Sequence, residues 1–166
     1  MDDDLAAVEF ERLLRAHARS MLQFADFVLH DRSAAEDAAQ EAFMIAWRRR
    51  GTLRRDSSFT AWLRTIVLRE CLRWRRRRFF TALSLSDRVI APPAPDSSSR
   101  LDLSHALRRL SPALRAVIYL HFYEDQTLKG LALQLGIPES TAKTRLYEAL
   151  RRLRAALPEY AGEAQP

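Results

Sequence analysis

Cysteine and long apolar runs are scarce in this 166-residue sequence. Cys71 is the only cysteine, so an intrachain disulfide is impossible and zinc sites built from several cysteines are excluded. No apolar run approaches the ~20 residues that span a bilayer. The first residues, MDDDLAAVEFERLL, are acidic where a secretory signal would be basic. We therefore expect a cytoplasmic protein with no membrane partner.

The residue patterns that carry catalysis are also missing. The four histidines do not have the spacing of metal ligands, and there is no Ser/His/Asp arrangement, glycine-rich phosphate loop or pair of carboxylates. The sequence predicts that the protein is not an enzyme and that it binds no metal and no cofactor.

Positive charge, in contrast, is abundant. The net charge is +6, the isoelectric point is about 10.2, and 48% of the residues are hydrophobic. A chain of this length and composition forms one or two small domains. A basic surface favours polyanionic partners, and charge alone does not choose between nucleic acid and an anionic membrane surface.

The stretch from Thr127 to Leu157 predicts two short helices around a tight turn. Helical periodicity stops at Gly136 and resumes after it. Thr127 is a helix-capping residue, Gly136 suits the left-handed conformation that ends a helix, and Pro138 suits a helix start. The apolar positions are Leu128, Leu131, Ala132 and Leu135, followed by Ala142, Leu146, Ala149, Leu150 and Leu153. This is the outline of a helix-turn-helix.

The second of these helices has a polar face opposite its apolar stripe. The residues of this face are Ser140, Lys143, Thr144, Tyr147 and Arg151. Such a face can enter the major groove of DNA, where polar side chains meet base edges and cations meet phosphates. An ordinary amphipathic hairpin with a solvated outer face has the same pattern, so this segment alone leaves both interpretations open.

Three helices are predicted before residue 81. The first covers residues 5–29; a capping box of Ser33 and Glu36 opens the second, which runs to about Arg49; the third covers residues 59–80. The second helix carries alanines that allow a neighbour to approach closely, namely Ala35, Ala38, Ala39, Ala42 and Ala46. The other face of this helix contains Asp37, Gln40, Glu41, Met44 and Trp47. Its acidic residues can simply stabilise the helix dipole near the N-terminus, or the face can bind a partner helix.

Arginine is concentrated between residues 48 and 78. This segment contains twelve arginines and only two acidic residues, Asp56 and Glu70. Aromatic residues lie among the arginines or directly after them, namely Trp62, Trp74, Phe79 and Phe80. Cations and aromatic planes together form surfaces that bind single-stranded nucleic acid. We expect Trp62 to belong to the core. The run Arg75 to Arg78 instead favours phosphate contact, because so dense a cluster repels itself unless an anion relieves it.

Residues 81–99 lose helical periodicity and gain prolines and serines, so they predict a flexible linker. A helix from Ser99 to Leu110 and another begun by Ser111 and Pro112 follow. The apolar support for the helix-turn-helix is expected from Val117, Ile118, Leu120, Phe122 and Tyr123. The predicted fold is all-α, with domains at residues 1–80 and 100–158 and a tail at residues 159–166.

Taken in this order, the segments resemble the extracytoplasmic-function (ECF, group IV) RNA polymerase sigma factors. The strongest matches are AEDAAQEAFMIAWRR at Ala35 to Arg49, SSFTAWLRTIVLRECLRWRRRR at Ser57 to Arg78, and the segment from Leu110 to Arg154. The resemblance implies a non-catalytic protein made of sigma region 2, a linker and sigma region 4. Such a protein binds core RNA polymerase and directs it to promoter DNA for transcription initiation.

The resemblance also implies site residues. Those that match the polymerase-docking helix, which meets the clamp helices of the β′ subunit, are Asp37, Gln40, Glu41, Phe43 and Trp47, with Phe43 and part of Trp47 packing inward. Those that match the base-capturing loop and the strand-opening helix of the minus-ten element are Arg54, Arg55, Ser57, Ser58, Arg73, Trp74, Arg75, Arg76 and Arg77. Those that match the minus-thirty-five helix are Ser140, Thr141, Lys143, Thr144, Arg145, Tyr147, Glu148 and Arg151. The β flap and an anti-sigma factor are further partners that the family implies.

Two positions depart from the family pattern. Glu148 stands where a basic residue is usual, and its carboxylate repels phosphate but can accept from a cytosine amino group. The loop around Arg54 and Arg55 is more charged than usual. The competing interpretations are a stand-alone helix-turn-helix regulator, which would leave the acidic docking helix unexplained, and a basic helical module that binds RNA or a membrane surface.

Overall fold

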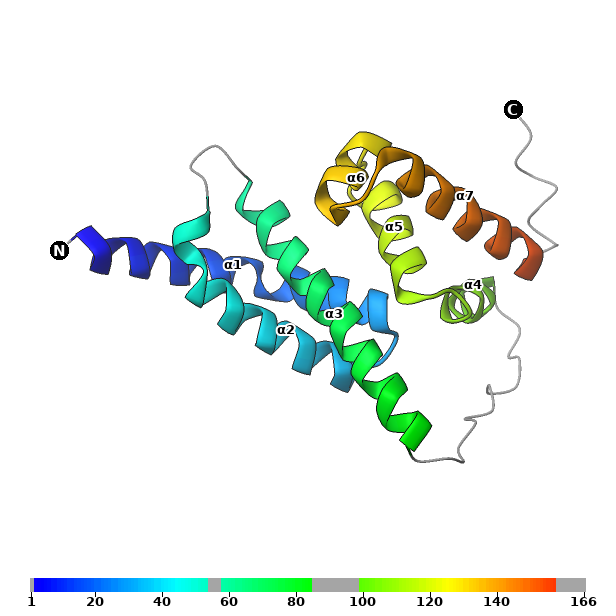
Figure 1. Cartoon of the computed structure of the whole chain (residues 1–166), viewed down its shortest axis with the longest axis horizontal. Coiled ribbons are helices and arrows are strands. Elements are labelled where there is room, and N and C mark those ends of the chain that lie inside the picture. Colours follow the sequence, from blue (N-terminus) through cyan, green and yellow to red (C-terminus); the bar gives the residue numbers. More distant parts are fainter. Residues whose placement is uncertain (1, 54–57, 85–98, 158–166) are drawn as a thin grey trace. The chain divides into compact units, whose positions relative to one another are not determined.

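The computed structural model describes residues 2–53, 58–84 and 99–157, and the side chains of residues 7–53, 58–78 and 102–157 (Figure 1). The chain divides into two compact units, residues 1–77 and 78–166. The described part of the chain contains helices and no strand, which confirms the all-α prediction. None of its helices is long and apolar enough to cross a membrane.

The first unit is built from α1 (Asp2–Leu29), α2 (Arg32–Arg48), the short 3₁₀ helix η1 (Arg50–Thr52) and α3 (Phe59–Ser84). The helices α1 and α2 pack closely because the contact face of α2 is alanine. The buried alanines are Ala34, Ala35, Ala38, Ala39, Ala42 and Ala46. They lie against Met21, Phe24 and Val28 of α1, all fully buried, in the same core.

The start of α2 differs from the sequence prediction. His30 takes a left-handed conformation (φ 53°) and Asp31 is the N-cap, where its carboxylate accepts a hydrogen bond from the Ala34 amide at 3.0 Å. The predicted capping box of Ser33 and Glu36 is therefore wrong, because Asp31 already caps the helix and places Ser33 inside the first turn. Glu36 pairs instead with Arg32, at 2.7 Å.

The helix α3 lies obliquely across α1 and α2 (Figure 1). The Phe10 ring of α1 meets the rings of Trp47, Phe59 and Trp62 edge-on, at centroid distances of 5.9, 5.5 and 6.0 Å. The Thr60 hydroxyl and His17 Nε2 are 3.0 Å apart. Trp62 is half-buried in this cluster. The contacts fix the end of α2 and the start of α3, which are the two ends of the loop at residues 51–58.

Cys71 lies in the core of this unit. Burial, together with the neighbouring Glu70 carboxylate, raises the pKa of its thiol to about 12, so the thiol stays neutral at physiological pH and behaves as a small apolar side chain.

The second unit contains α4 (Ser99–Arg108), α5 (Pro112–Phe122), α6 (Leu128–Leu135) and α7 (Glu139–Ala156). Val117, Ile118 and Leu120 of α5 are buried as predicted. Phe122 and Tyr123 are not: they are 55% and 68% exposed, because α5 ends at Phe122 and its last side chains extend beyond the packed region. The Tyr123 ring stacks on Tyr119 instead, at 5.2 Å.

The helix-turn-helix has the geometry that its sequence predicts. The Thr127 hydroxyl accepts from the Gly130 amide at 3.1 Å and caps α6. Gly136 ends α6 in the left-handed conformation (φ 63°), which glycine adopts without steric cost. Pro138 is the N-cap of α7, and its carbonyl accepts from the Ala142 amide at 3.0 Å.

A buried arginine joins α4 to α5. Arg115, only 2% exposed, donates from Nη1 to the carbonyls of Leu107, Arg108 and Leu110, at 3.3, 3.3 and 2.9 Å. Leu107 and Arg108 end α4 and Leu110 follows it, in the region where carbonyls lack the amide donors of a continuing helix. The Leu107 carbonyl also accepts from the Leu110 amide at 3.0 Å. Arg115 therefore fixes α4 against the helix that supports the helix-turn-helix.

We predict that Arg115→Met lowers the free energy of unfolding of the second unit by about 2–3 kcal/mol, because it removes the guanidinium donor of the buried Leu110 carbonyl. Denaturant unfolding of the full chain, followed by circular dichroism, measures this change. Arg108→Met is the control, since that side chain is exposed on α4. Equal unfolding midpoints for the two variants would contradict the role of Arg115.

Candidate nucleic-acid and protein-docking surfaces

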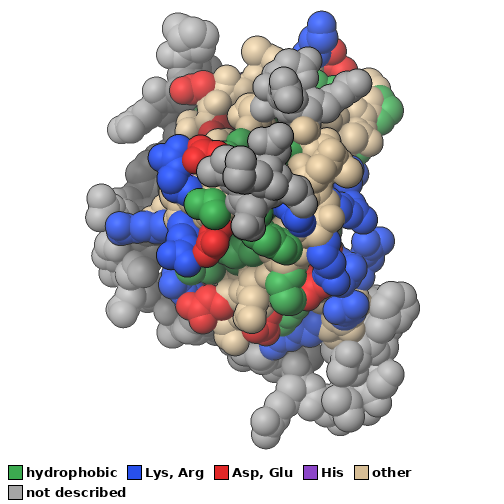
Figure 2. Space-filling view, turned by 90° about the vertical axis from the view of Figure 1, so that its left-hand side faces the viewer, with side chains coloured by type: hydrophobic (Ala, Val, Ile, Leu, Met, Phe, Trp, Pro, Cys, Tyr) green, Lys and Arg blue, Asp and Glu red, His purple; other side chains and the backbone are tan. Residues whose placement is uncertain are grey.

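An open apolar groove of about 970 Å³ runs between α1 and α2, and we call it the α1–α2 groove. Its lining residues are Glu11, Ala18, Arg19, Leu22, Glu36, Ala39, Gln40, Phe43, Met44, Trp47 and Arg48. Three of the five predicted docking residues, Gln40, Phe43 and Trp47, are thus brought together. Met44 is 48% and Trp47 37% exposed. Figure 2 views the molecule from the side of the α1 N-terminus and shows apolar surface bordered by acidic and basic side chains.

The two acidic docking candidates, Asp37 and Glu41, have different surroundings. Asp37 is exposed on α2, and no cation in the described part of the chain lies within ion-pair distance of it. The Glu41 carboxylate lies 3.6 Å from Arg48 and 3.9 Å from Arg73 of α3, which also pairs with Glu70 at 3.1 Å. Glu41 therefore links α2 to α3 as well as facing solvent.

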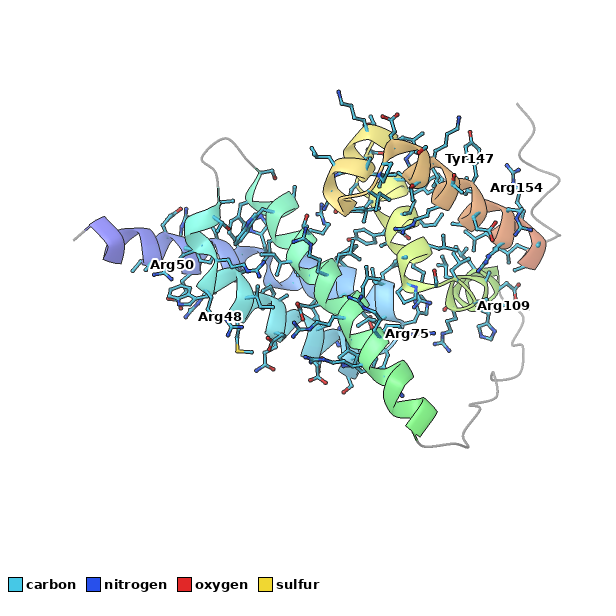
Figure 3. The ribbon with its side chains drawn as sticks, in the orientation of Figure 1. Arg48, Arg50, Arg75, Arg109, Tyr147 and Arg154 are labelled. Carbon is cyan, nitrogen blue, oxygen red and sulfur yellow. The ribbon has the colours of Figure 1, made fainter. Side chains whose placement is uncertain are left out.

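The arginines of residues 48–78 do not all share one surface. Arg75 to Arg78 are exposed along α3, with Arg73 and Trp74 half-buried beside them. Figure 3 shows Arg48, the last residue of α2, Arg50 at the start of η1, and Arg75 along α3. The Arg50 guanidinium lies 5.0 Å from the Trp47 ring centroid. Arg64 is the exception, because it is buried with its guanidinium 6.0 Å from the Phe24 ring.

Part of the predicted minus-ten surface lies outside the described residues. These are Arg54, Arg55 and Ser57 of the loop, together with the side chains of Phe79 and Phe80. Ser58, which immediately precedes α3, is described and exposed. Its hydroxyl lies 3.4 Å from the Ala61 amide.

The exposed face of α7 contains the polar residues that its periodicity predicts. Ser140, Lys143, Thr144, Tyr147 and Arg151 are all exposed, whereas Thr141 and Arg145 are half-buried. The Thr144 hydroxyl donates to the Ser140 carbonyl at 2.9 Å, and Lys143 Nζ lies 5.9 Å from the Tyr147 ring centroid. Figure 3 shows Tyr147 projecting from the outer side of α7.

Glu148 is engaged with its own helix. Its carboxylate accepts two hydrogen bonds from Arg151, both at 2.9 Å, and one from Arg152 at 2.6 Å. These hydrogen bonds, first from Arg151 and then from Arg152, hold the pKa of the Glu148 carboxyl below its usual value. Glu148 is therefore a carboxylate at physiological pH, with both oxygens occupied.

Sequence reasoning missed several residues of these surfaces. Glu11, Ala18, Arg19 and Leu22 complete the α1–α2 groove from α1, and no local pattern marks them, since the groove exists only when two helices pack. Arg152 was missed although its spacing of four residues from Glu148 is that of a helical ion pair.

The described part of the chain thus combines an open apolar groove in one helical unit with a helix-turn-helix, a motif of DNA-binding proteins, in the other. Residues 9–79 match the family described as Sigma-70 region 2, and residues 106–155 match Sigma-70, region 4. The chain is 33% identical to the ECF RNA polymerase sigma factor SigL of Mycobacterium tuberculosis, with 93% of this chain and 94% of SigL covered. It is 30% identical to SigM of the same organism, with 87% and 74% covered.

Among solved structures, the fold is similar to that of the sigma factor RpoE in its complex with the anti-sigma factor NepR from Bartonella quintana. The TM-score is 0.72 at 26% identity, with 90% of this chain and 97% of the RpoE chain covered. The chain belongs to the ECF RNA polymerase sigma factors: it binds core RNA polymerase and directs promoter-specific initiation of transcription. The alternatives of a stand-alone regulator and of an RNA- or membrane-binding module are not favoured.

Proposed function

We propose that this sigma factor divides its work between the surfaces described above. The α1–α2 groove, together with Asp37 and Glu41 of α2, docks on the clamp helices of the β′ subunit. The helix α3 and the residues before it open the minus-ten element, and α7 reads the minus-thirty-five element. The protein performs no catalysis and works in the cytoplasm. The observation that carries the proposal is the exposure of Met44 and Trp47 on the same helix as Asp37, whose carboxylate has no ion pair within the described part of the chain.

The groove fits a partner helix with apolar and basic side chains. Covering the exposed side chains of Met44 and Trp47 would stabilise the complex with a partner by about 25 cal/mol for each Å² of apolar surface buried. A cation from the partner would meet Asp37 without first breaking an ion pair. Glu41 is a weaker anchor, because docking there competes with Arg48 and Arg73.

The surface of α3 supports strand opening. Arg73, Arg75, Arg76 and Arg77 supply cations for the backbone of the opened strand, and Trp74 supplies a ring on which a base can stack. Extruding a base costs a few kcal/mol, which a pocket next to such a surface can offset. Arg54, Arg55, Ser57 and Ser58, in the loop that precedes α3, are proposed to form that pocket.

The N-terminal half of α7 supports base reading. Residues near the start of a recognition helix reach base edges in the major groove, and Ser140, Lys143, Thr144 and Tyr147 are exposed there. Lys143 can donate to guanine and Thr144 to either base type. The half-buried Thr141 and Arg145 lie at the border of the face, where backbone phosphates are the closer partners.

Two further partners are proposed for this chain. The β flap of the polymerase would hold the second unit at the minus-thirty-five element. An anti-sigma factor is proposed because RpoE, to which this fold is similar, was solved with one.

In vitro transcription from a genomic fragment library tests the proposal as a whole. Core RNA polymerase with this protein should produce start sites that are absent without it, and these starts should share two spaced upstream elements. Duplex binding without polymerase, and no new starts, would contradict the proposal.

We predict that Asp37→Lys weakens binding to core RNA polymerase about tenfold or more, because it places a cation against a basic partner helix. Fluorescence titration of labelled protein with core polymerase measures the dissociation constant. Glu9→Lys is the matched charge-reversal control, since Glu9 is exposed on α1 and is not one of the proposed docking residues. An unchanged constant for a folded Asp37→Lys variant would remove the docking assignment.

We predict that replacing Lys143 and Thr144 by alanine relaxes the minus-thirty-five preference while polymerase binding stays unchanged. Each side chain that hydrogen-bonds a base edge discriminates against the wrong base by about 1–3 kcal/mol, and alanine cannot form that hydrogen bond. Transcription from promoters mutated at single minus-thirty-five positions reports the preference. A parallel loss of polymerase affinity would show that docking and reading are not separate.

A further inference from the structure

Glu148 holds two arginines of α7 in defined positions. Its Oε1 accepts from Arg152 Nε and Arg151 Nη2, and its Oε2 accepts from Arg151 Nε. Hydrogen bonds between charged groups are about twice as strong as neutral ones. A carboxylate has about four acceptor positions, so these three hydrogen bonds leave at most one, on Oε2, for a cytosine amino group. Glu148 is therefore poorly placed to read a base.

The pairing leaves the outer parts of both guanidinium groups available. Arg151 uses Nε and one N–H of Nη2, so its Nη1 end remains open; Arg152 uses Nε, so both of its terminal nitrogens remain open. Both side chains are exposed. Because each guanidinium is already held in one orientation, binding a phosphate oxygen requires little further loss of side-chain conformational entropy.

The same two arginines line a hollow of about 310 Å³ together with Arg109 at the C-terminal end of α4. The remaining lining residues are Ala106, Ala155 and Ala156, whose small side chains leave the hollow open. Figure 3 shows Arg109 at the end of α4. Arg115 fixes that end of α4 through three hydrogen bonds, so the position of Arg109 is defined by the fold.

We propose that Arg109, Arg151 and Arg152 form a binding site for a backbone phosphate of the promoter duplex, and that Glu148 is the positioning residue that holds two of these arginines in place. This inference rests on the proposed reading of DNA by α7. The hollow is next to the reading face, because Arg151 follows Tyr147 by four residues on the exposed side of the helix. When α7 enters the major groove of the duplex, the phosphates at the edge of that groove come close to the hollow.

The variant Glu148→Gln distinguishes three roles by the sign of its effect on affinity and by whether that effect depends on the promoter sequence. Holoenzyme reconstituted from core polymerase and full-length protein is titrated with the promoter recovered by in vitro transcription, and the dissociation constant is measured. A positioning role gives binding about fivefold to tenfold weaker on every promoter, although a negative charge near DNA has been removed.

The matched control is Glu139→Gln, which removes the same charge from the first turn of the same helix. If Glu148 only repels phosphate, Glu148→Gln binds as tightly as the control or tighter, and the proposal is overturned. A loss confined to promoters with cytosine at one position would assign Glu148 to base reading, which also overturns it. Thermal unfolding of each variant checks that α7 is intact.

Arg109→Ala tests the hollow itself. Removing one phosphate-binding cation should weaken binding and reduce the slope of log affinity against log salt by about one. Arg108→Ala removes the same charge from the neighbouring residue, which does not line the hollow, and should leave the slope unchanged. Equal slopes for the two variants would overturn the site. Failure of the wild-type holoenzyme to bind any promoter would instead count against the proposed function.

Discussion

Both helical units depend on alanine at their helix contacts. In the first unit, six buried alanines of α2 allow close approach to α1. In the second, Ala116 of α5 and Ala142 and Ala149 of α7 are fully buried where α5 and α7 pack. Small side chains bring the backbones together and leave the larger apolar residues of the other faces exposed. Because alanine fills most of the contact with α1, Met44 and part of Trp47 remain exposed, although the Trp47 ring also meets Phe10.

Local chemistry explains which parts of the structure the sequence could predict. The helix-turn-helix was predicted correctly because capping by Thr127 and the left-handed Gly136 are properties of a few neighbouring residues. The start of α2 was predicted wrongly for a related reason: two residues within three positions can cap a helix, and the backbone turn at His30 selects Asp31 over Ser33.

Tertiary packing explains what could not be predicted. The sequence does not reveal that Arg64 and Arg115 are buried while Arg75 and Arg109 are exposed, because arginine is usually exposed and is buried only where the fold supplies partners. Arg115 is buried because the end of α4 offers it carbonyls, and that end is brought there by the fold. The α1–α2 groove likewise requires residues from two helices.

Phe10 gives the first unit a property that the second does not have. One ring contacts Trp47, in the proposed docking surface, and Phe59 and Trp62, at the start of the proposed strand-opening helix. Substitutions in either surface must remain compatible with this ring, so the two surfaces are constrained to change together during evolution. The reading face of α7 rests on a separate core. Substitutions in α7 can therefore change the promoter preference between paralogues without changing the proposed docking surface.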